Sequence, residues 1–298
     1  DMDRALDPDP GVARRARLQN AFPVREMIKR GWLEDTDAVT LESQVARFFG
    51  VSNANEIPHL DHAAKKTHYD QIPAAQLAWL FRVRQIAKEI SVPRYSEKAL
   101  RESLSKLRAL VVAPEEARHV PRILAECGVR FIIVEALPNA KIDGVCFWLD
   151  KQSPVIGMSL LYDRIDNFWF VLRHEIEHVL QKHGQSKEII DSELGAEAKQ
   201  GSNALPLEER VANEAAANFC IPSHEMTSFI ARKEPFFAER DVLGFARRLQ
   251  VHPGIVVGQI QKRTERWDYL RRYLVKIRSS VLPGAIVDGW GQVAPVAL

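Results

Sequence analysis

Two histidines and a glutamate lie within five consecutive residues, His174-Glu175-Ile176-Glu177-His178, which form the motif H-E-x-x-H. On a helix, His174 and His178 are one turn apart and project from the same face, so two imidazole nitrogens can reach one metal ion. Glu175 lies beside them and can take a proton from metal-bound water, whose pKa falls towards 7 on coordination. The motif therefore predicts half of a zinc site together with its general base.

The motif lies in a segment with the periodicity of an amphipathic helix, predicted from about residue 167 to residue 183. Random placement of the 9 histidines and 39 acidic residues would produce the motif fewer than about 0.04 times. The alternative is a surface helix on which the same side chains serve as caps or ion pairs. Five apolar residues form a stripe beside the histidines: Phe168, Leu172, Ile176, Val179 and Leu180.

Catalytic zinc generally has three protein ligands and one open position, so a third ligand must come from elsewhere. A histidine six residues past His178 is excluded because Gly184 stands there. His183, five residues on, lies about 500° around the helix and off the ligand face. The remaining route is a carboxylate on a later helix. The alanine-rich segment 207–220 can pack closely against the first helix, and spacing alone does not choose among its three candidates: Glu208, Glu209 and Glu214.

The stretch from Asp166 to His178, followed by Glu209-x-x-Ala212-Asn213 and Ile221-Pro222, resembles the ImmA/IrrE family of bacterial and phage metallopeptidases. The likeness spans roughly residues 120 to 260 and includes segments at 142–145 and 252–258. It implies that Glu209 is the third zinc ligand and that Asn213 supports the ligands from behind. It also implies a Zn²⁺ cofactor, with another divalent metal as the alternative.

Two positions depart from the family pattern. Ala215-Ala216 stands where the family has a phenylalanine-alanine pair, and Glu177 stands where it usually has a small residue. The direction of Glu177 on the predicted helix is close to the solvent side. We therefore expect its carboxylate to be solvated, with control of access to the metal as the alternative.

The pattern around the motif predicts an α+β, mainly helical, zincin-like fold. Three short β-branched stretches, at 129–134, 144–149 and 155–160, predict a small, largely antiparallel three-stranded sheet. Helical periodicity dominates before and after them. We expect an N-terminal helical region at 1–98, in which residues 1–20 are a tether leading into a helix, a metallopeptidase domain at 99–225, and a helical C-terminal region at 226–298.

The predicted reaction is peptide hydrolysis, in which Glu175 deprotonates the attacking water and passes the proton to the leaving amine. An extended substrate can pair along the free edge of strand 155–160. Tyr162, Arg173 and His224 are candidates for oxyanion or substrate contact, with packing or surface roles as the alternative. The resemblance implies a specific protein substrate, a repressor or an antitoxin. Neither the oligomeric state nor a role for residues 283–298 follows from the sequence.

Charge and composition limit the partners. The net charge of +2 gives no global case for a nucleic-acid or membrane partner. The three scattered cysteines fit a reducing cytoplasm, and no apolar run approaches the roughly 18 residues that span a bilayer. We therefore expect a cytoplasmic protein.

Two other classes of function compete with the peptidase. One alternative is a transcriptional regulator or antitoxin-like binding protein whose metallopeptidase fold serves sensing or partner binding. A nucleic-acid role would fit the segment 261–278, which holds seven Lys or Arg against two acids and carries Trp267, Tyr269 and Tyr273. We favour a terminal helix whose aromatics face the core. Relatives with a stretch like Pro23–Trp32 often carry a helix-turn-helix domain ahead of it, and residues 1–20 are too few for one, so DNA binding would need a missing or separate domain. A structural zinc is disfavoured because two histidines and one glutamate leave a coordination position open.

Overall fold

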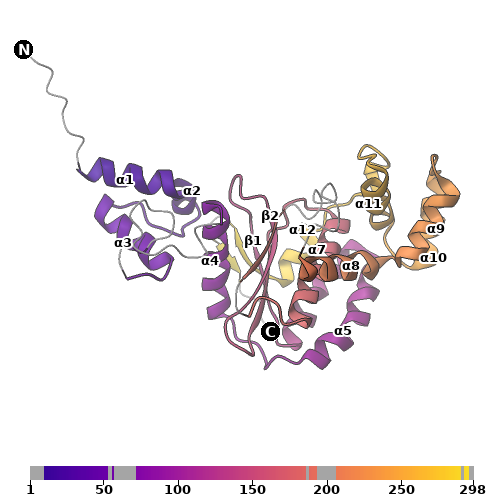
Figure 1. The fold of residues 1–298 in the computed structure, drawn as a ribbon, viewed down its shortest axis with the longest axis horizontal. Coiled ribbons are helices and arrows are strands. Elements are labelled where there is room, and N and C mark those ends of the chain that lie inside the picture. The colour runs from indigo at the N-terminus through magenta and orange to yellow at the C-terminus, as the bar shows by residue number, and fades with distance from the viewer. Residues whose placement is uncertain are drawn as a thin grey trace, which may run out of the picture.

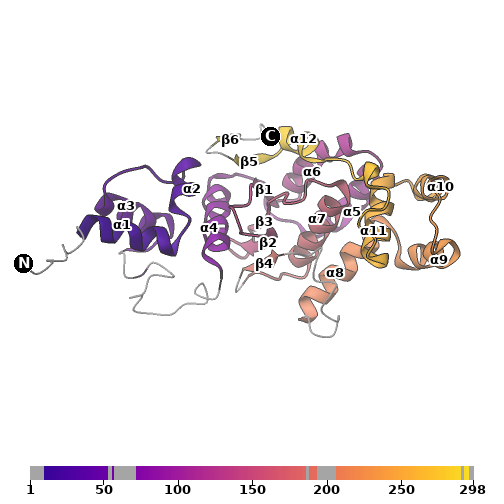
Figure 2. The same ribbon diagram turned by 90° about the horizontal axis from the view of Figure 1, so that it is seen from above.

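The structure is a computed structural model that describes residues 10–52, 56, 72–185, 188–192, 206–289 and 292–294. Its helices and strands form an α+β fold, mainly helical, in which a central sheet has helices on both faces (Figures 1 and 2). Within the described residues the sheet has six strands in the order β4-β2-β3-β1-β5-β6. The strands are β1 (Arg130–Val134), β2 (Ile142–Trp148), β3 (Pro154–Met158), β4 (Ile189–Ser192), β5 (Ile286–Gly289) and β6 (Gln292–Ala294).

Three of these strands match the three β-branched stretches of the sequence, and their pairing differs in part from the expected one. β2 and β3 form an antiparallel hairpin, as expected. β1 instead runs parallel to β3 and to β5, so the sheet is mixed, and the expected number of three strands is wrong because the described residues form six. β2 follows β1 in the chain, but β3 lies between these two strands in the sheet. Such a crossover, and the addition of strands from distant parts of the chain, leave no local pattern in the sequence.

The first four α-helices of the described residues are α1 (Pro10–Ala21), α2 (Val24–Lys29), α3 (Ala38–Phe48) and α4 (Ala74–Glu89). Gly31 and Gly50 follow α2 and α3 with φ values of 72° and 68°, as expected of residues that end helices. The tether expected for residues 1–20 is wrong from Pro10 onward, because α1 begins there and buries Leu18 completely. Residues 1–9 lie outside the described residues.

The remaining helices include the two that the sequence places at 167–183 and 207–220. The terminal helix expected over 261–278 is wrong: α11 ends at Thr264, and Glu265 and Leu270 have φ values of 56° and 47°, which an α-helix does not allow. The helices are α5 (Glu97–Leu110), α6 (Val120–Glu126), α7 (Ile165–Leu180), α8 (Leu207–Cys220), α9 (Ser223–Lys233), α10 (Glu239–Leu249), α11 (Pro253–Thr264) and α12 (Arg278–Val281).

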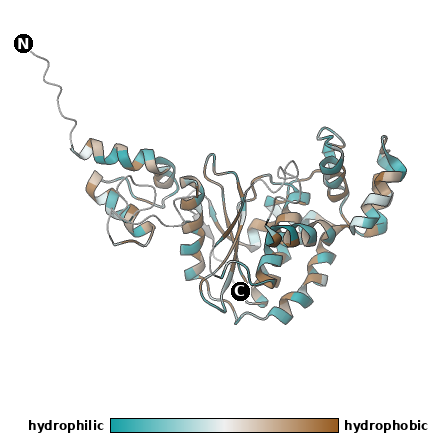
Figure 3. Ribbon diagram, viewed as in Figure 1, coloured by the Kyte–Doolittle hydropathy of each residue, from teal (hydrophilic) through white to brown (hydrophobic). Residues whose placement is uncertain are grey.

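The sheet separates two hydrophobic cores, because alternate residues of a strand face opposite sides. Ile132 and Val134 of β1 pack with α1 to α4, whereas Phe131 and Ile133 pack with α5 to α12. In Figure 3 the strands of the sheet are mostly brown, while the flanking helices carry both colours, as helices with one buried face should. The metal-motif helix α7 belongs to the second core.

The division at residues 98 and 225 stays a prediction. Strands β5 and β6, from the region expected to be a separate helical part, nevertheless pair within the central sheet. In the described part of the chain, no helix combines the length and the apolar character that crossing a membrane requires.

Candidate metal centre

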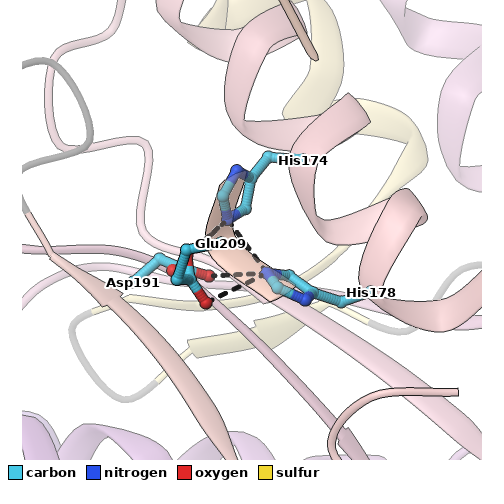
Figure 4. A group of neighbouring side chains, drawn as sticks. All are labelled: His174, His178, Asp191 and Glu209. Carbon is cyan, nitrogen blue, oxygen red and sulfur yellow. Dashed lines mark hydrogen bonds and ion pairs between the residues drawn. The ribbon is translucent and has the colours of Figure 1, made fainter. Parts of the chain in front are cut away.

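The two histidines of the motif converge as predicted. Both side chains are completely buried, and their Nε2 atoms lie 3.0 Å apart. They come from successive turns of α7, whose apolar residues pack against the sheet and fix the ring positions. Figure 4 shows both rings pointing toward the same point, which two carboxylates also face. Two imidazole nitrogens are therefore available to one ion.

Glu209 is the glutamate of α8 that reaches this point. Its Oε2 lies 3.3 Å from Nε2 of His174, and its Oε1 lies 3.5 Å from Nε2 of His178. Glu208 and Glu214, the other two candidates, are exposed. The close approach of the helices was expected from the alanines of α8, two of which, Ala212 and Ala216, are buried. The structure thus places Glu209 where the family resemblance put the third ligand.

Asp191 is a fourth member of the group, and sequence reasoning missed it. Its Oδ1 lies 3.3 Å from Nε2 of His174, its Oδ2 lies 3.9 Å from Nε2 of His178, and its side chain is 4% exposed. It stands on β4, opposite Gly144 of β2. The only local signal is an acid at the end of the apolar pair Ile189-Ile190. That signal cannot place Asp191, because its position depends on which strand β4 pairs with.

The four side chains offer ligand atoms that all lie within 4.8 Å of one another, and the group can hold one metal ion. Two imidazole nitrogens and two carboxylate oxygens form a donor set that suits Zn²⁺ and other divalent ions of the first transition row. Oδ2 of Asp191 is buried and finds no hydrogen-bond partner among the described residues. Two buried carboxylates aimed at one point are costly unless a cation lies between them. The residues therefore fit a metal.

The pKa values of the two imidazoles are shifted in opposite directions. Burial lowers the pKa of His174, but hydrogen bonds to Asp191 and Glu209 outweigh it and raise this pKa to about 9. Burial, with the nearby charge of His174, lowers the pKa of His178 to about 3. The Nε2 atoms of the two imidazoles face each other at 3.0 Å, so they cannot both carry a proton. A metal ion would bind to both Nε2 atoms in place of the one proton between them.

Glu175 lies next to this group but not in it. Its carboxyl is completely buried, and neither oxygen has a hydrogen-bond partner among the described residues. Burial, followed by the charge of Asp191, raises the pKa of Glu175 well above its usual value. The carboxyl lies against the backbone of Gly144, where a Cβ atom would fall within 2.9 Å of its Cδ. An unpaired carboxyl beside a metal group is the arrangement expected of a general base.

His183 lies outside the ligand group, as its position along the sequence implied, but it contacts the His178 ring on the side away from the other ligands. Its Nδ1 is 3.0 Å from Nδ1 of His178, the nitrogen that faces away from the other ligands. The backbone carbonyl of His183 accepts a hydrogen bond from Nε1 of Trp148 on β2. His183 is thus held in place to fix the orientation of the His178 ring.

The solvated position expected for Glu177 is wrong. Every residue of α7 from Val171 to Leu180 is buried, because the fold covers the face of this helix that the sequence assigned to solvent. Arg173 donates to Oε2 of Glu177 at 2.7 Å, and Gln181 donates to Oε1 at 2.6 Å. Burial raises the pKa of Glu177, but these two hydrogen bonds outweigh it and lower the pKa below its usual value. Glu177 is therefore an ionised, paired residue.

Tyr162 is not in the metal group. It lies 47% exposed in the wall of a cavity of about 390 Å³, which Phe170 of α7 and Ala216 of α8 also line. The Phe170 ring is stacked 6.4 Å from the His174 ring, so the cavity begins one helical turn from the metal group. Tyr162 thus remains a candidate for substrate contact. Asn213, half-buried one turn beyond Glu209, likewise stays a predicted supporting residue.

The free strand edge expected for substrate pairing is not where it was predicted. β3 lies between β2 and β1, so both of its edges are paired. β4 pairs with β2 at the edge of the sheet nearest the metal group. Of the other oxyanion candidates, Arg173 is bound to Glu177, and His224 belongs to α9.

No protein-family model matches this sequence, and a search of curated proteins found no match either. The resemblance to the ImmA/IrrE family therefore depends on the residues that carry it, from Asp166 to His178 and from Glu209 to Pro222.

Proposed function

We propose that this protein is a metal-dependent endopeptidase of the ImmA/IrrE type, with zinc as the preferred ion. The observation that carries the proposal is the convergence of His174, His178 and Glu209 beside the unpaired, buried carboxyl of Glu175. A divalent ion at this point would polarise a peptide carbonyl and lower the pKa of a bound water.

The chain's own residues would divide the reaction between them. His174, His178 and Glu209 would hold the ion, and His183 would fix the His178 ring through its outer nitrogen. Glu175 would take the proton of the attacking water on one carboxyl oxygen and deliver it to the leaving amine. Its burial and its raised pKa favour this proton shuttle, because a carboxyl with a raised pKa holds the proton more readily between the two transfers.

The proposed substrate is a specific regulatory protein, a repressor or an antitoxin, cleaved in the cytoplasm. The family resemblance supports this class of substrate, and the three buried, free cysteines fit a reducing compartment. The product of the neighbouring gene is the first protein to incubate with the purified enzyme.

Metal analysis combined with one substitution tests the proposal. The purified protein should hold close to one equivalent of metal, and Glu209→Ala should bind it more weakly, because only His174, His178 and Asp191 would remain as ligands. Glu214→Ala is the matched control, because Glu214 lies on the same helix, is exposed and should leave the metal content unchanged. Glu175→Gln should keep the metal and abolish cleavage. A Glu175→Gln variant that still cleaves at the normal rate would remove the assigned base.

A regulator with a structural metal is the second candidate, and Asp191 is the observation that favours it. Four protein ligands close a tetrahedral site, whereas a catalytic site keeps one position open. Such a regulator would lack hydrolytic activity under every condition, including after replacement of Asp191. The two candidate functions therefore predict different hydrolytic activity after replacement of Asp191.

A further inference from the structure

Strand β4 is the part of the chain that separates the metal group from an extended ligand. It is four residues long and lies at the edge of the described sheet. Its residues pair antiparallel with β2, and Asp191 stands opposite Gly144. Gly144 in turn lies against the Glu175 carboxyl. One short strand thus covers the segment of β2 that adjoins both the metal group and the general base.

An extended peptide substrate would need main-chain pairing with the sheet beside the metal group and a coordination position on the ion, and β4 uses both. Peptides that add to a sheet do so by main-chain hydrogen bonds to an edge strand. The edge strand beside this metal group is β4, and β2 would become the edge strand if β4 were displaced. A hydrolytic metal site also needs a coordination position for water or substrate. The carboxylate of Asp191, 3.3 Å from Nε2 of His174, offers a fourth ligand atom and would take that position on a bound ion. β4 therefore covers the side of β2 next to the metal group and would also fill the coordination position.

We propose that β4 is an internal occupant of the substrate site, and that the site receives an extended peptide segment only when this peptide replaces β4 along β2 and Asp191 leaves the metal. This inference rests on the proposed function and names the binding mode of its substrate. It also explains how one group can have four protein ligands and still belong to a peptidase.

Within the described residues, β4 is held by its ladder with β2 and by contacts of Ile190 and of the preceding Glu188. The ladder between β2 and β4 is interrupted by a bulge between Ile142 and Gly144. Outside the ladder, Ile190 packs partly buried against the N-terminal core, and Glu188 forms an ion pair with Arg84 of α4. A short edge strand with an irregular ladder opens more readily than a central strand. Arg84 and Glu188 provide a contact that can be weakened without touching any metal ligand.

The test uses the full-length chain loaded with Co²⁺, whose visible absorption reports the coordination of the ion, and acetohydroxamate as the added ligand. The apparent dissociation constant of a ligand that needs the open position equals its intrinsic value divided by the fraction of molecules that are open. We expect Asp191→Ala to keep Co²⁺ and to be half-saturated at an acetohydroxamate concentration at least about tenfold lower than the wild type. Asp191→Asn, nearly equal in shape, should shift in the same direction.

Two further variants test whether β4 itself must move or whether Asp191 acts only as a metal ligand. Glu188→Gln should also lower the half-saturating concentration, because it loosens β4 while all four ligands remain. Glu214→Gln, an exposed acid on α8, should leave it unchanged. If Glu188→Gln behaves like the wild type, β4 does not need to move. Equal half-saturation of the wild type and Asp191→Ala, or complete loss of Co²⁺ in both Asp191 variants, would overturn the inference.

These results differ from a failure of the proposed function. If the wild type does not bind Co²⁺ at all, the metal site and this inference both fall before acetohydroxamate is added. If the wild type binds Co²⁺ and Glu175→Gln abolishes cleavage, while the Asp191 and Glu188 variants match the wild type in the acetohydroxamate titration, only the inference about β4 falls.

Discussion

Gly144 of β2 and Glu175 of α7 are in direct contact, and the contact exists because Gly144 has no side chain. A Cβ atom at this position would lie within 2.9 Å of Cδ of Glu175 and closer still to Oε1. The backbone of β2 and the carboxyl of the proposed base thus occupy adjoining space. The strand fixes where the carboxyl can lie, and four variants test this and related contacts.

Gly144→Ala should displace the Glu175 carboxyl, whose atoms are the nearest to the added Cβ atom, while all four ligand side chains remain in the chain. We expect the variant to retain the metal and to lose about 100-fold in kcat/KM, since a displacement of about 1 Å at a reacting group has this effect. Metal content and the rate of cleavage of the partner protein measure the two quantities separately.

Gly244→Ala is the control for that substitution. Gly244 lies within α10, and a Cβ atom there meets nothing within 4 Å. Activity should be unchanged and stability should rise by about 1 kcal/mol, because alanine is the better helix former. A Gly144→Ala enzyme as active as Gly244→Ala would show that Glu175 does not depend on this contact.

His183→Ala should weaken the metal site from behind. Loss of the partner of Nδ1 frees the His178 ring to rotate, and supporting partners of this kind are worth about 10- to 100-fold in metal affinity. Competition with a chelator measures the affinity. His119→Ala, which replaces an exposed histidine far from the site in the sequence, should leave it unchanged. Equal affinities in the two variants would assign His183 to packing alone.

Asp288→Ala should destabilise the whole fold, because Asp288 joins the C-terminal strand β5 to α4. Its side chain is completely buried and forms an ion pair with Arg82. Removing one partner of a buried pair costs about 3 kcal/mol or more, and the partial exposure of Arg82 places this case at the lower end. Urea unfolding measures it. Asp35→Ala, which breaks the exposed pair with Arg15, should cost less than about 1 kcal/mol.

His252→Asn should remove a pH dependence of stability. Nδ1 of His252 accepts a hydrogen bond from the backbone N–H of Gly254 at the start of α11, and burial lowers the pKa of His252 below its ordinary value of 6.5. Because the unfolded chain binds this proton more readily, the contribution of His252 to stability is present above pH 6.5 and is lost as the pH falls toward the folded-state pKa.

Asparagine keeps an acceptor at the helix start but does not titrate. Unfolding by urea at pH 5.5 and at pH 7.5 should therefore show a smaller difference between the two pH values in His252→Asn than in the wild type. An unchanged difference would assign the pH dependence to other groups.

The periodicity of the sequence predicted most of the helices, because an amphipathic stripe or a helix-ending glycine is a property of neighbouring residues. It also predicted that His174 and His178 face one point, since two residues four apart on a helix must do so. It failed at Glu177, whose side of α7 is exposed on an isolated helix and covered in the fold. It failed again at residues 261–278, where left-handed residues interrupt a pattern that reads as helical.

What the sequence alone determined was therefore the half of the site that lies on one helix, His174, Glu175 and His178. The family resemblance added Glu209. Only the tertiary structure could bring in Asp191, the contact of Gly144 with Glu175, and the strands β5 and β6, because strand order and register depend on pairing between residues far apart in the chain. A helix fixes the relative positions of its own side chains, whereas a sheet edge acquires its partners only when the whole chain has folded.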